Sequence, residues 1–335
     1  MGEDGTGIGF ETGFALPDSS LGESLVPDRL YDVLVLGAGP AGLSAAIYLL
    51  RKGLDTGIIT GNIGGQVTWS ASIENYLGYR LVEGVQLVEK FNDQLKEFPV
   101  GLGLEEEATS VSGSEGAWEV RTGKGSYRGR SLVLATGKRP RMLNVPGEKS
   151  LLGKGVAYCA ICDAPLYKGK VTAVAGGGNS GLEAALDLAR VSPKVYLVEM
   201  GAALTGDTVL RGKVAALANV EVLTGTEIVE ILGEERVTGV AVQSAAGGGV
   251  RNLDVEGIFV EVGLLPNSEL FRDLVKRNGR GEVEIDCLCR TSAPGVFAAG
   301  DVTAVPYKQI VVAAGDGAKA ALSAYDYLLR SVKKE

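Results

Sequence analysis

The chain contains the same pattern of strand, glycine-rich loop and helix twice, and this duplication restricts its fold more than any other feature. In the first copy the apolar run at residues 31–36 leads into Gly37-Ala38-Gly39-Pro40-Ala41-Gly42, and residues 43–52 form an expected helix that ends at Gly53. The first glycine of such a loop makes the turn, the second admits a pyrophosphate, and the third allows close packing of helix on strand. Since a helix N-terminus also favours phosphate, this unit predicts a dinucleotide site.

The second copy begins 139 residues later, at Gly176. Its loop, Gly176-Gly177-Gly178-Asn179-Ser180-Gly181, follows the apolar run 171–175 and precedes an expected helix at 182–190 and a strand at 194–198. Glu199 stands 23 residues past the first glycine, where a carboxylate can accept hydrogen bonds from an adenosine ribose. Thr60 occupies that position in the first copy, so ribose recognition at the first site must be made otherwise.

The two copies also continue alike. Residues 117–121 and 126–128 form an expected hairpin before the apolar run 132–137, and residues 237–244 and 250–254 form another before the run 257–263. The last third has an apolar run at 296–299 and an expected helix from about 317 to 332, but no third glycine fingerprint. We therefore predict an α/β fold with two Rossmann-like dinucleotide-binding domains, each with a β-meander insert.

The expected domain order follows from these units. Residues 1–29 are interpreted as an N-terminal extension outside the core, either flexible or laid over a surface. Residues 30–140 form the first part of the first dinucleotide-binding domain, residues 141–266 form the second domain, and residues 267–335 return to complete the first. With 335 residues and 45% hydrophobic content, the chain is long enough for two domains with separate cores.

A pair of cysteines lies 14 residues ahead of Gly176, in the segment Cys159-Ala160-Ile161-Cys162-Asp163. Two thiols at this spacing can close a disulfide that a thiolate opens. A structural zinc ion would need four ligands, and because the sequence contains no histidine, only Cys287 and Cys289 could complete the set. Packing without chemistry is the third interpretation. The nearby nucleotide loop favours redox chemistry, and we expect no metal.

Composition excludes several other functions. The lack of histidine removes Ser-His-Asp and Cys-His nucleophile pairs. A net charge of −8 and a pI near 5.0 argue against a nucleic-acid partner. No apolar stretch approaches the roughly 18 residues of a membrane span, and the N-terminus has neither the basic start nor the apolar core of a signal peptide. Together with the few cysteines, this predicts a cytoplasmic protein without membrane contact.

Shorter motifs accompany these units from residue 31 to the end of the chain: Gly64-Gly65-Gln66, Ile73-Glu74-Asn75-Tyr76, Ala135-Thr136-Gly137, Gly263-Leu264-Leu265-Pro266-Asn267, Gly300-Asp301 and Tyr307-Lys308-Gln309-Ile310. With the two glycine loops and the cysteine pair, this combination resembles the thioredoxin reductase family of low-molecular-weight type. It is most similar to the alkyl hydroperoxide reductase flavoprotein type without the thioredoxin-like N-terminal domain. Together the motifs are highly specific.

The resemblance implies that the first site holds FAD and the second a nicotinamide dinucleotide. It assigns to FAD the residues Gly37, Gly39, Pro40, Ala41, Gly42, Gly65, Gln66, Asn75, Ala135, Thr136, Gly137, Gly300, Asp301, Lys308, Gln309 and Ile310. It assigns to the nicotinamide dinucleotide the residues Gly176, Gly178, Asn179, Ser180, Glu199 and Gly263. For Asp301 the alternative is a helix-start acid in a Gly-Asp turn.

The second site bears on the choice of nicotinamide. Members of the family that use NADPH carry a basic pair just after the second strand, where this chain has Glu199-Met200-Gly201-Ala202 and no Lys or Arg before Arg211. A carboxylate there accepts from both ribose hydroxyls and repels a phosphate. We expect NADH rather than NADPH, the alternative being that Glu199 only solvates a strand end.

The resemblance further implies a route for electrons. Hydride passes from the nicotinamide to FAD, and the reduced flavin opens a Cys159–Cys162 disulfide. Cys162 faces the flavin, Cys159 attacks the disulfide of a thioredoxin-like or glutaredoxin-like protein, and Asp163 is the general acid, with a helix-start carboxylate as its alternative. A homodimer is implied as well. Because the dithiol and the nicotinamide loop share one domain, we expect a domain swing with hinges near residues 138–140 and 266–267.

Three other functions stay open. A reductase fed by ferredoxin would keep the fold but lose nicotinamide binding, against which the intact second loop with Glu199 argues. A flavin redox sensor or scaffold without turnover is disfavoured by the Cys-x-x-Cys-Asp motif. A peroxide-reducing NADH oxidase would use a single cysteine near the flavin in the first domain, which the sequence lacks. Cys287 and Cys289 are expected on one face of a strand, where buried packing is favoured over redox chemistry.

Overall fold

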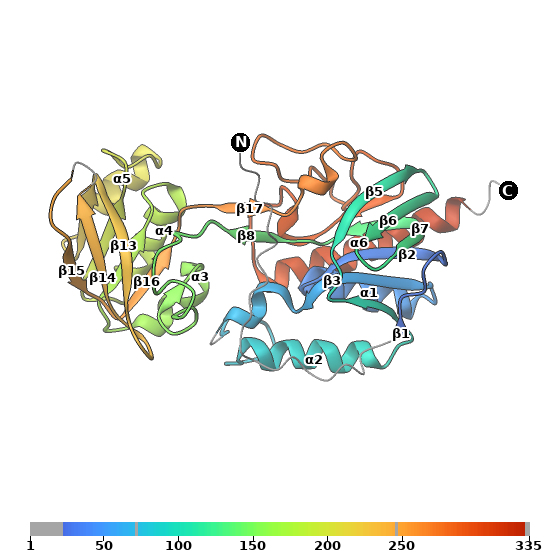
Figure 1. Cartoon of the computed structure of the whole chain (residues 1–335), viewed down its shortest axis with the longest axis horizontal. Helices are drawn as coiled ribbons and strands as arrows, with labels where there is room; N and C mark the ends of the chain where they lie inside the picture. The colour runs from blue at the N-terminus through green and yellow to red at the C-terminus, as the bar shows by residue number, and fades with distance from the viewer. Residues whose placement is uncertain (1–22, 71–72, 245–246, 332–335) are drawn as a thin grey trace.

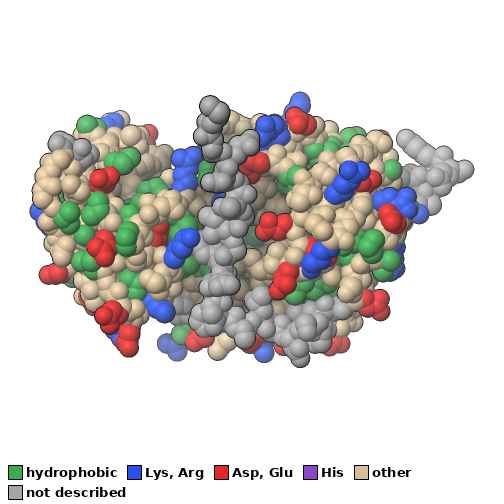
Figure 2. Space-filling model, in the orientation of Figure 1, with side chains coloured by type: hydrophobic (Ala, Val, Ile, Leu, Met, Phe, Trp, Pro, Cys, Tyr) green, Lys and Arg blue, Asp and Glu red, His purple; other side chains and the backbone are tan. Residues whose placement is uncertain are grey.

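The computed structural model describes residues 23–70, 73–244 and 247–331, which form two lobes (Figure 1). Two strands connect the lobes, β8 (Lys138–Pro140) and β17 (Leu264–Pro266), and they pair antiparallel. The two ends of the chain build the larger lobe, and the middle of the chain builds the smaller one. Figure 2 shows acidic and basic side chains interspersed over the described part of one face of both lobes.

The first lobe is organised around an eight-stranded sheet. Strands β1, β4, β3, β2 and β7 are parallel neighbours in that order, β18 joins β7 in parallel, and β6 and β5 extend from β7 as an antiparallel meander. The elements of this lobe are β1 (Glu23–Ser24), β2 (Leu30–Ala38), α1 (Pro40–Arg51), β3 (Thr56–Ile63), η1 (Gly65–Trp69), α2 (Gly84–Lys96), β4 (Gly101–Leu104), β5 (Ala108–Ser114), β6 (Ala117–Thr122), β7 (Ser126–Leu134), η3 (Glu269–Phe271), β18 (Val296–Ala298), η4 (Gly300–Val302) and α6 (Ile310–Ser331).

Strand β2 lies at the centre of this sheet and is buried on both faces. Val33 and Val35 belong to a core cluster that includes residues of α1, α2 and α6. Leu34 and Leu36 belong to a second cluster on the opposite face, with residues of β6 and β7. Burial on both faces explains why this strand is a continuous apolar run in the sequence rather than an alternating one.

The second lobe contains a five-stranded parallel sheet in the order β12-β11-β10-β16-β9 and a three-stranded antiparallel sheet, β13-β14-β15. Its elements are β9 (Val156–Ala157), α3 (Ala160–Asp163), η2 (Ala164–Tyr167), β10 (Thr172–Ala175), α4 (Asn179–Leu188), β11 (Val195–Glu199), α5 (Thr208–Ala215), β12 (Val220–Thr224), β13 (Thr226–Gly233), β14 (Val237–Ser244), β15 (Arg251–Asp254) and β16 (Gly257–Val260). Each lobe thus has a parallel sheet with an antiparallel meander, which confirms the predicted α/β fold class. Within the described ranges, no helix combines the length and the apolar content that a membrane crossing requires.

The long C-terminal helix begins earlier than the sequence predicts. α6 starts at Ile310 instead of about residue 317, because Gly315 and Gly317 weaken the helical signal over its first turns. The packing requires one of these glycines: a Cβ at Gly317 would lie 2.0 Å from the carbonyl oxygen of Ala41, where α6 crosses α1. The helix lies in the first lobe (Figure 1).

The described chain begins inside the first sheet. β1 pairs in parallel with β4, and Leu25 is 6% exposed. Three glycines make room for Leu25, since a Cβ at Gly57, Gly101 or Gly103 would approach its side chain to 2.7, 3.0 or 2.8 Å. Residues 23–25 therefore belong to the sheet and its core rather than to an extension outside them, and a strand this short has no sequence period that could predict it. The rest of that extension up to residue 22 lies outside the described residues.

A Leu25→Ala substitution is expected to lower the free energy of unfolding by about 2–4 kcal/mol, because the surrounding glycines have no side chains that could fill the cavity. Urea unfolding of the full chain measures this. The matched control is Val26→Ala, whose side chain is 49% exposed and whose backbone N–H, not its side chain, bonds to the Tyr31 hydroxyl. The control is expected to change stability by less than about 0.5 kcal/mol, and equal effects of the two substitutions would contradict the packing account.

Candidate disulfide and dinucleotide sites

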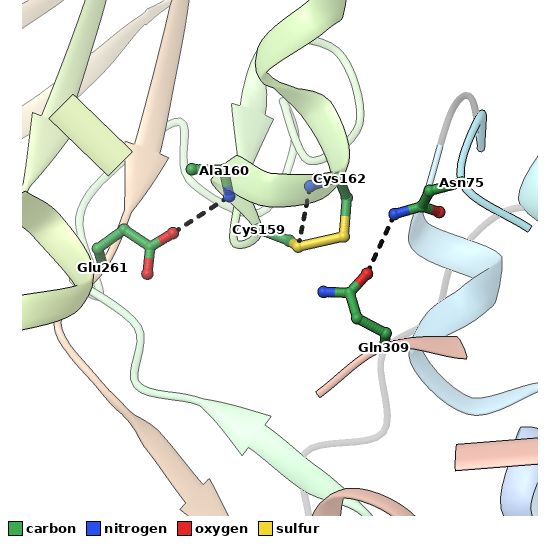
Figure 3. The surroundings of a disulfide bond; sticks show 6 residues. All are labelled: Asn75, Cys159, Ala160, Cys162, Glu261 and Gln309. Carbon is green, nitrogen blue, oxygen red and sulfur yellow. Dashed lines mark hydrogen bonds between the residues drawn. A yellow bond between two sulfur atoms is a disulfide. The ribbon is translucent and has the colours of Figure 1, made fainter. Parts of the chain in front are cut away.

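Cys159 and Cys162 form a disulfide at the start of α3, with their Cα atoms 5.4 Å apart. The N–H of Cys162 donates to Cys159 Sγ at 3.3 Å. The S–S bond faces Asn75 and Gln309 of the first lobe, whose side chains share a hydrogen bond of 3.0 Å (Figure 3). The structure thus brings the cysteine pair opposite two residues that the family resemblance assigns to FAD. Because the two sulfurs bond to each other, this arrangement favours redox chemistry over zinc binding.

Asp163 is the last residue of α3, and its side chain does not cap a helix. It occupies the N-cap position of η2 but makes no side-chain cap hydrogen bond there. Its Oδ1 atom is buried and has no hydrogen-bond partner among the described residues. Burial raises the pKa of Asp163 to about 6. The helix-start interpretation is therefore disfavoured, and a carboxyl beside Cys162 with a pKa near neutrality can hold or release a proton.

The first glycine loop has the shape that a pyrophosphate requires. A Cβ at Gly37 would lie 2.4 Å from the carbonyl oxygen of Ala135, and a Cβ at Gly42 would lie 1.8 Å from that of Gly37, so both glycines pack against backbone. In contrast, a Cβ at Gly39 would meet no atom within 4 Å. Gly39 is the N-cap of α1, with Pro40 in the first turn. The open side of the loop and the free N–H groups of that turn fit the pyrophosphate of FAD.

Gly300 and Asp301 begin η4, and Gly300 packs against Ala41 of the first glycine loop. Gly300 has a φ of 72°, and a Cβ there would lie 2.8 Å from the Cβ of Ala41. Ala299, not Asp301, occupies the N-cap position of η4, which disfavours the helix-start alternative for the acid. Burial raises the pKa of Asp301, against the opposing charges of Lys308 and Lys138. A polar group held in this half-buried position fits a contact with FAD.

Thr136 and Gly137 are bonded to Asn267 where the two connecting strands leave the first lobe. The Thr136 hydroxyl donates to the Asn267 carbonyl at 2.7 Å, the Asn267 side-chain amide donates to the Thr136 carbonyl at 2.8 Å, and the Asn267 N–H donates to the Gly137 carbonyl at 2.9 Å. Gln66 donates to the carbonyl of Lys138, the first residue of β8. Gly65, directly before Gln66, has a φ of 56°, a left-handed conformation that favours glycine. Three residues assigned to FAD therefore also anchor the lobe junction.

A buried ion pair at the same junction has no signal in the sequence. Lys138 Nζ lies 2.5 Å from Glu282 Oε1, and the two side chains are 8% and 5% exposed. Burial acts to raise the pKa of Glu282, but hydrogen bonds from Lys138 and Asn278 outweigh it and lower that pKa to about 2. Lys308 donates to the carbonyl of Thr303 at 2.7 Å, and its ammonium lies 4.0 Å from the Glu282 carboxylate. The ammonium of Lys308, a residue that the family resemblance assigns to FAD, thus lies at the lobe junction.

Glu199 is held at the second glycine loop by backbone donors. Its carboxylate accepts from the N–H of Gly177 at 2.5 Å and from the N–H of Gly201 at 2.6 Å. In the first lobe the hydroxyl of Thr60 takes the matching place and accepts from the N–H of Ala38 at 3.2 Å. The two units therefore use a hydroxyl, in the first, and a carboxylate, in the second, at one structural position.

The second loop has the same open side as the first. The nearest atom to a Cβ at Gly178 would be Thr205 Oγ1, 4.0 Å away. Asn179 accepts a hydrogen bond from the N–H of Asp207 at 2.7 Å, and Ser180 is exposed in the first turn of α4. These residues fit a second pyrophosphate at the start of α4.

Gly176 and Gly263 lie at the ends of neighbouring strands. Their φ angles of 113° and 109° fall in the region that favours glycine. The Gly263 carbonyl accepts from the N–H of Arg141 at 2.9 Å. Glu261, between β16 and Gly263, carries a carboxylate that accepts from the N–H of Ala160 at 3.3 Å (Figure 3). Glu261 has no signal in the sequence, because it follows an apolar strand and belongs to no motif.

Cys287 and Cys289 form no disulfide, and the prediction that they lie on one face of a strand is wrong. Cys287 is exposed and Cys289 is buried. The N–H of Cys289 donates to the Asp286 carbonyl at 3.0 Å, and Cys289 has a φ of 60°, so the chain turns here and separates the two side chains. Burial of Cys289 agrees with the packing interpretation.

The chain matches known proteins along most of its length. The pyridine nucleotide-disulphide oxidoreductase family matches residues 31–317. An alkyl hydroperoxide reductase component from Xanthomonas campestris pv. phaseoli is 45% identical over 305 residues, and the component of the same name from Escherichia coli (strain K12) is 43% identical over 314 residues. These alignments cover 90% and 92% of this chain but 58% and 60% of those proteins, so the chain spans less than two thirds of their length.

Solved structures match both lobes. Thioredoxin reductase from Streptococcus pyogenes MGAS5005 is 34% identical with a TM-score of 0.86, over 90% of this chain and 99% of that one. Thioredoxin reductase from Giardia duodenalis is 31% identical with a TM-score of 0.84, over 90% of this chain and 100% of that one. The match includes the lobe that carries the cysteine pair. The chain therefore belongs to the pyridine nucleotide-disulphide oxidoreductase family of enzymes, and within it to the thioredoxin reductase type.

Proposed function

We propose that this enzyme uses NADH and FAD to reduce the disulfide of a thioredoxin-like or glutaredoxin-like protein. The observation that carries the proposal is the position of the Cys159–Cys162 bond, which faces the Asn75–Gln309 pair of the first lobe (Figure 3). A disulfide at the edge of a flavin site can receive electrons on one side and pass them to a second disulfide on the other.

FAD, when bound, supplies the two-electron relay between the nicotinamide and the disulfide. The residues proposed to hold it lie in residues 30–140 and 267–335, with the first glycine loop at the pyrophosphate. Residues 141–266 are proposed to hold NADH, with Gly176 to Ser180 at its pyrophosphate and Glu199 at the adenosine ribose. The open sides of Gly39 and Gly178 support this division.

Cys159 is proposed as the thiol that attacks the partner, and Cys162 as the thiol on the flavin side. The Cys159 thiolate bonds to one sulfur of the partner disulfide and displaces the other sulfur, which takes a proton from Asp163. The Cys162 thiol then returns a proton to Asp163, bonds to Cys159 Sγ and releases the second partner thiolate. The partner disulfide gains the two electrons that the cysteine pair loses.

An Asp163→Asn substitution is expected to stabilise the protein and impair turnover. Because burial raises the pKa of Asp163 to about 6, the folded state loses stability as pH rises from about 4 through about 6. The variant is expected to gain on the order of 2 kcal/mol in free energy of unfolding at neutral pH, and nothing at about pH 3. Its kcat for protein-disulfide reduction is expected to fall roughly 10²-fold. A gain that is independent of pH, or full activity, would contradict this role.

The cysteine pair and the second glycine loop share one lobe, so we propose that the lobes rotate about β8 and β17 during turnover. The hydrogen bonds of Asn267 and the Lys138–Glu282 pair fix the first-lobe ends of both strands, which leaves the strands as the moving part. A chemical cross-link between the lobes is expected to stop turnover and to leave binding of NADH intact. Unchanged turnover in the cross-linked enzyme would rule the rotation out.

The proposal differs from what the names of the relatives describe. The matched alkyl hydroperoxide reductase components are longer than this chain. The acceptor proposed for this chain is a separate small dithiol protein, whereas the names of those relatives refer to an alkyl hydroperoxide. A flavin reductase fed by ferredoxin is the second candidate. The homodimer and the cytoplasmic location expected from the sequence stay predictions.

Anaerobic titration of the FAD-loaded enzyme with NADH and NADPH in parallel tests the donor. Because the first two electrons pass on to the disulfide, NADH is expected to bleach the flavin fully at about two equivalents, and NADPH to do so at least about tenfold more slowly. A preference for NADPH would contradict the assignment of Glu199, and failure of both would favour a ferredoxin-type donor. A screen of small dithiol proteins with the reduced enzyme then identifies the acceptor.

A further inference from the structure

Glu261 connects the redox disulfide to the second glycine loop. It follows β16 directly, and its N–H donates to the Ala175 carbonyl at 2.8 Å. Its carbonyl oxygen lies against the first glycine of the loop, since a Cβ at Gly176 would be 2.5 Å from it. Its side chain reaches α3, where Oε1 accepts from the N–H of Ala160 at 3.3 Å (Figure 3). One residue thus touches the nucleotide loop through its backbone and the cysteine segment through its carboxylate.

The surroundings of Glu261 make its charge sensitive to pH. Burial raises the pKa of Glu261 to about 7, the N–H of Ala160 opposes this rise, and the charge of Glu183 on α4 adds to it. Two groups near the cysteine segment also have shifted pKa values: burial raises the pKa of Asp163 on α3 to about 6 and the pKa of Tyr167 on η2 to about 12. Glu261 therefore ionises in the range where the thiols of Cys-x-x-Cys motifs also do.

We propose that Glu261 is a positioning residue of the redox centre, whose carboxylate disfavours thiolate at the Cys159–Cys162 pair and makes the dithiol a stronger reductant above neutral pH. This inference rests on the proposed function, because it requires that the pair be reduced and reoxidised. The residue directly after Cys159 donates to the carboxylate, so the negative charge of Glu261 lies beside the segment that carries both sulfurs. A carboxylate and a thiolate on neighbouring residues of a half-buried site repel each other.

The proton balance follows from this repulsion. Opening the S–S bond adds two electrons to the pair and, above neutral pH, leaves one thiol and one thiolate. The new negative charge makes Glu261 harder to ionise, so reduction also draws a proton from solvent onto its carboxylate. In acid the carboxyl is already neutral, and its influence on the pair disappears. The dithiol–disulfide equilibrium should therefore carry a pH dependence that belongs to Glu261.

The test compares the wild-type enzyme with Glu261→Gln, which keeps an oxygen that accepts from Ala160 and removes the charge. The FAD-loaded full chain is equilibrated anaerobically in dithiothreitol buffers of defined ratio, then alkylated, and the free thiols at Cys159 and Cys162 are counted by mass. At about pH 8.5 the variant is expected to favour the dithiol about tenfold more than the wild type, which is about 30 mV for a two-electron couple. At about pH 5.5 the two proteins are expected to coincide.

Two further variants separate charge from structure. Glu256→Gln removes an exposed carboxylate just before the same strand and is expected to follow the wild-type curve at every pH. Glu261→Ala removes both the charge and the acceptor. If Glu261→Gln follows the wild type at every pH, the inference is overturned, even if Glu261→Ala shifts the equilibrium, because only the hydrogen bond would then matter. If the pair cannot be reduced in the wild-type enzyme, the proposed function falls together with the inference.

Discussion

Replacing either cysteine of the pair, as Cys159→Ser or Cys162→Ser, is expected to lower kcat/KM for a protein disulfide at least roughly 10³-fold. A single thiol can start an exchange but cannot complete it, because release of the partner requires the second sulfur. Reduction of the flavin by NADH is expected to continue in both variants, since neither sulfur takes part in the transfer of hydride to FAD. Steady-state assays with the dithiol protein, and anaerobic absorbance of the flavin, measure the two steps separately.

The two cysteine variants are expected to differ in what they trap. Cys162→Ser keeps the thiol assigned to attack the partner, so it should accumulate a mixed disulfide that mass spectrometry places at Cys159. The control is Cys287→Ser, an exposed cysteine that is not in a disulfide, which is expected to retain full activity. Trapping at Cys162 in the Cys159→Ser variant alone would reverse the assigned roles. Residual turnover by both variants would place the exchange elsewhere.

Removing the charge of Glu199 and adding a cation beside it is expected to change the choice of nicotinamide. The carboxylate is fixed at the end of β11 by the N–H groups of Gly177 and Gly201, where it would repel a 2′-phosphate and bind a free ribose. In Glu199→Gln/Met200→Arg the ratio of kcat/KM for NADH to that for NADPH is expected to fall roughly 10²-fold, which corresponds to about 2.7 kcal/mol. Met200 is 66% exposed, so an arginine there meets no packing constraint.

The single variant Met200→Arg is the matched control for this change. It adds the cation but keeps Glu199, so the new guanidinium should pair with the carboxylate and raise use of NADPH by less than about tenfold. Initial rates with both nicotinamides at several concentrations give the four values of kcat/KM. If the double variant keeps the wild-type ratio, Glu199 does not recognise the ribose, and the alternative that it only solvates a strand end would hold.

The parts of this fold that the sequence predicts are those set by local backbone chemistry. Gly37 and Gly176 each begin a tight turn after an apolar strand, and a residue with a side chain cannot take their place. Each turn therefore predicts its strand, its helix and the open loop between them. The cysteine pair is equally local, because four consecutive residues bring the two sulfurs within bonding range.

The parts that the sequence does not predict depend on residues far apart in the chain. Lys138 and Glu282 are separated by 144 residues, and Glu261 meets Ala160 across 101 residues. No local period marks either pair, and neither acid belongs to a motif in the sequence. At Cys289 a local signal is misleading. Its spacing from Cys287 predicts a strand, but its positive φ places it in a turn.

The most direct test of the whole account is to count thiols after one anaerobic equivalent of NADH, in the enzyme with and without FAD. Cys159 and Cys162 are expected to become two alkylatable thiols in the FAD-loaded enzyme, while in the FAD-free chain they stay joined. A flavin that bleaches while the disulfide stays closed would contradict it, as would a pair of sulfurs that proves to be held by a metal ion.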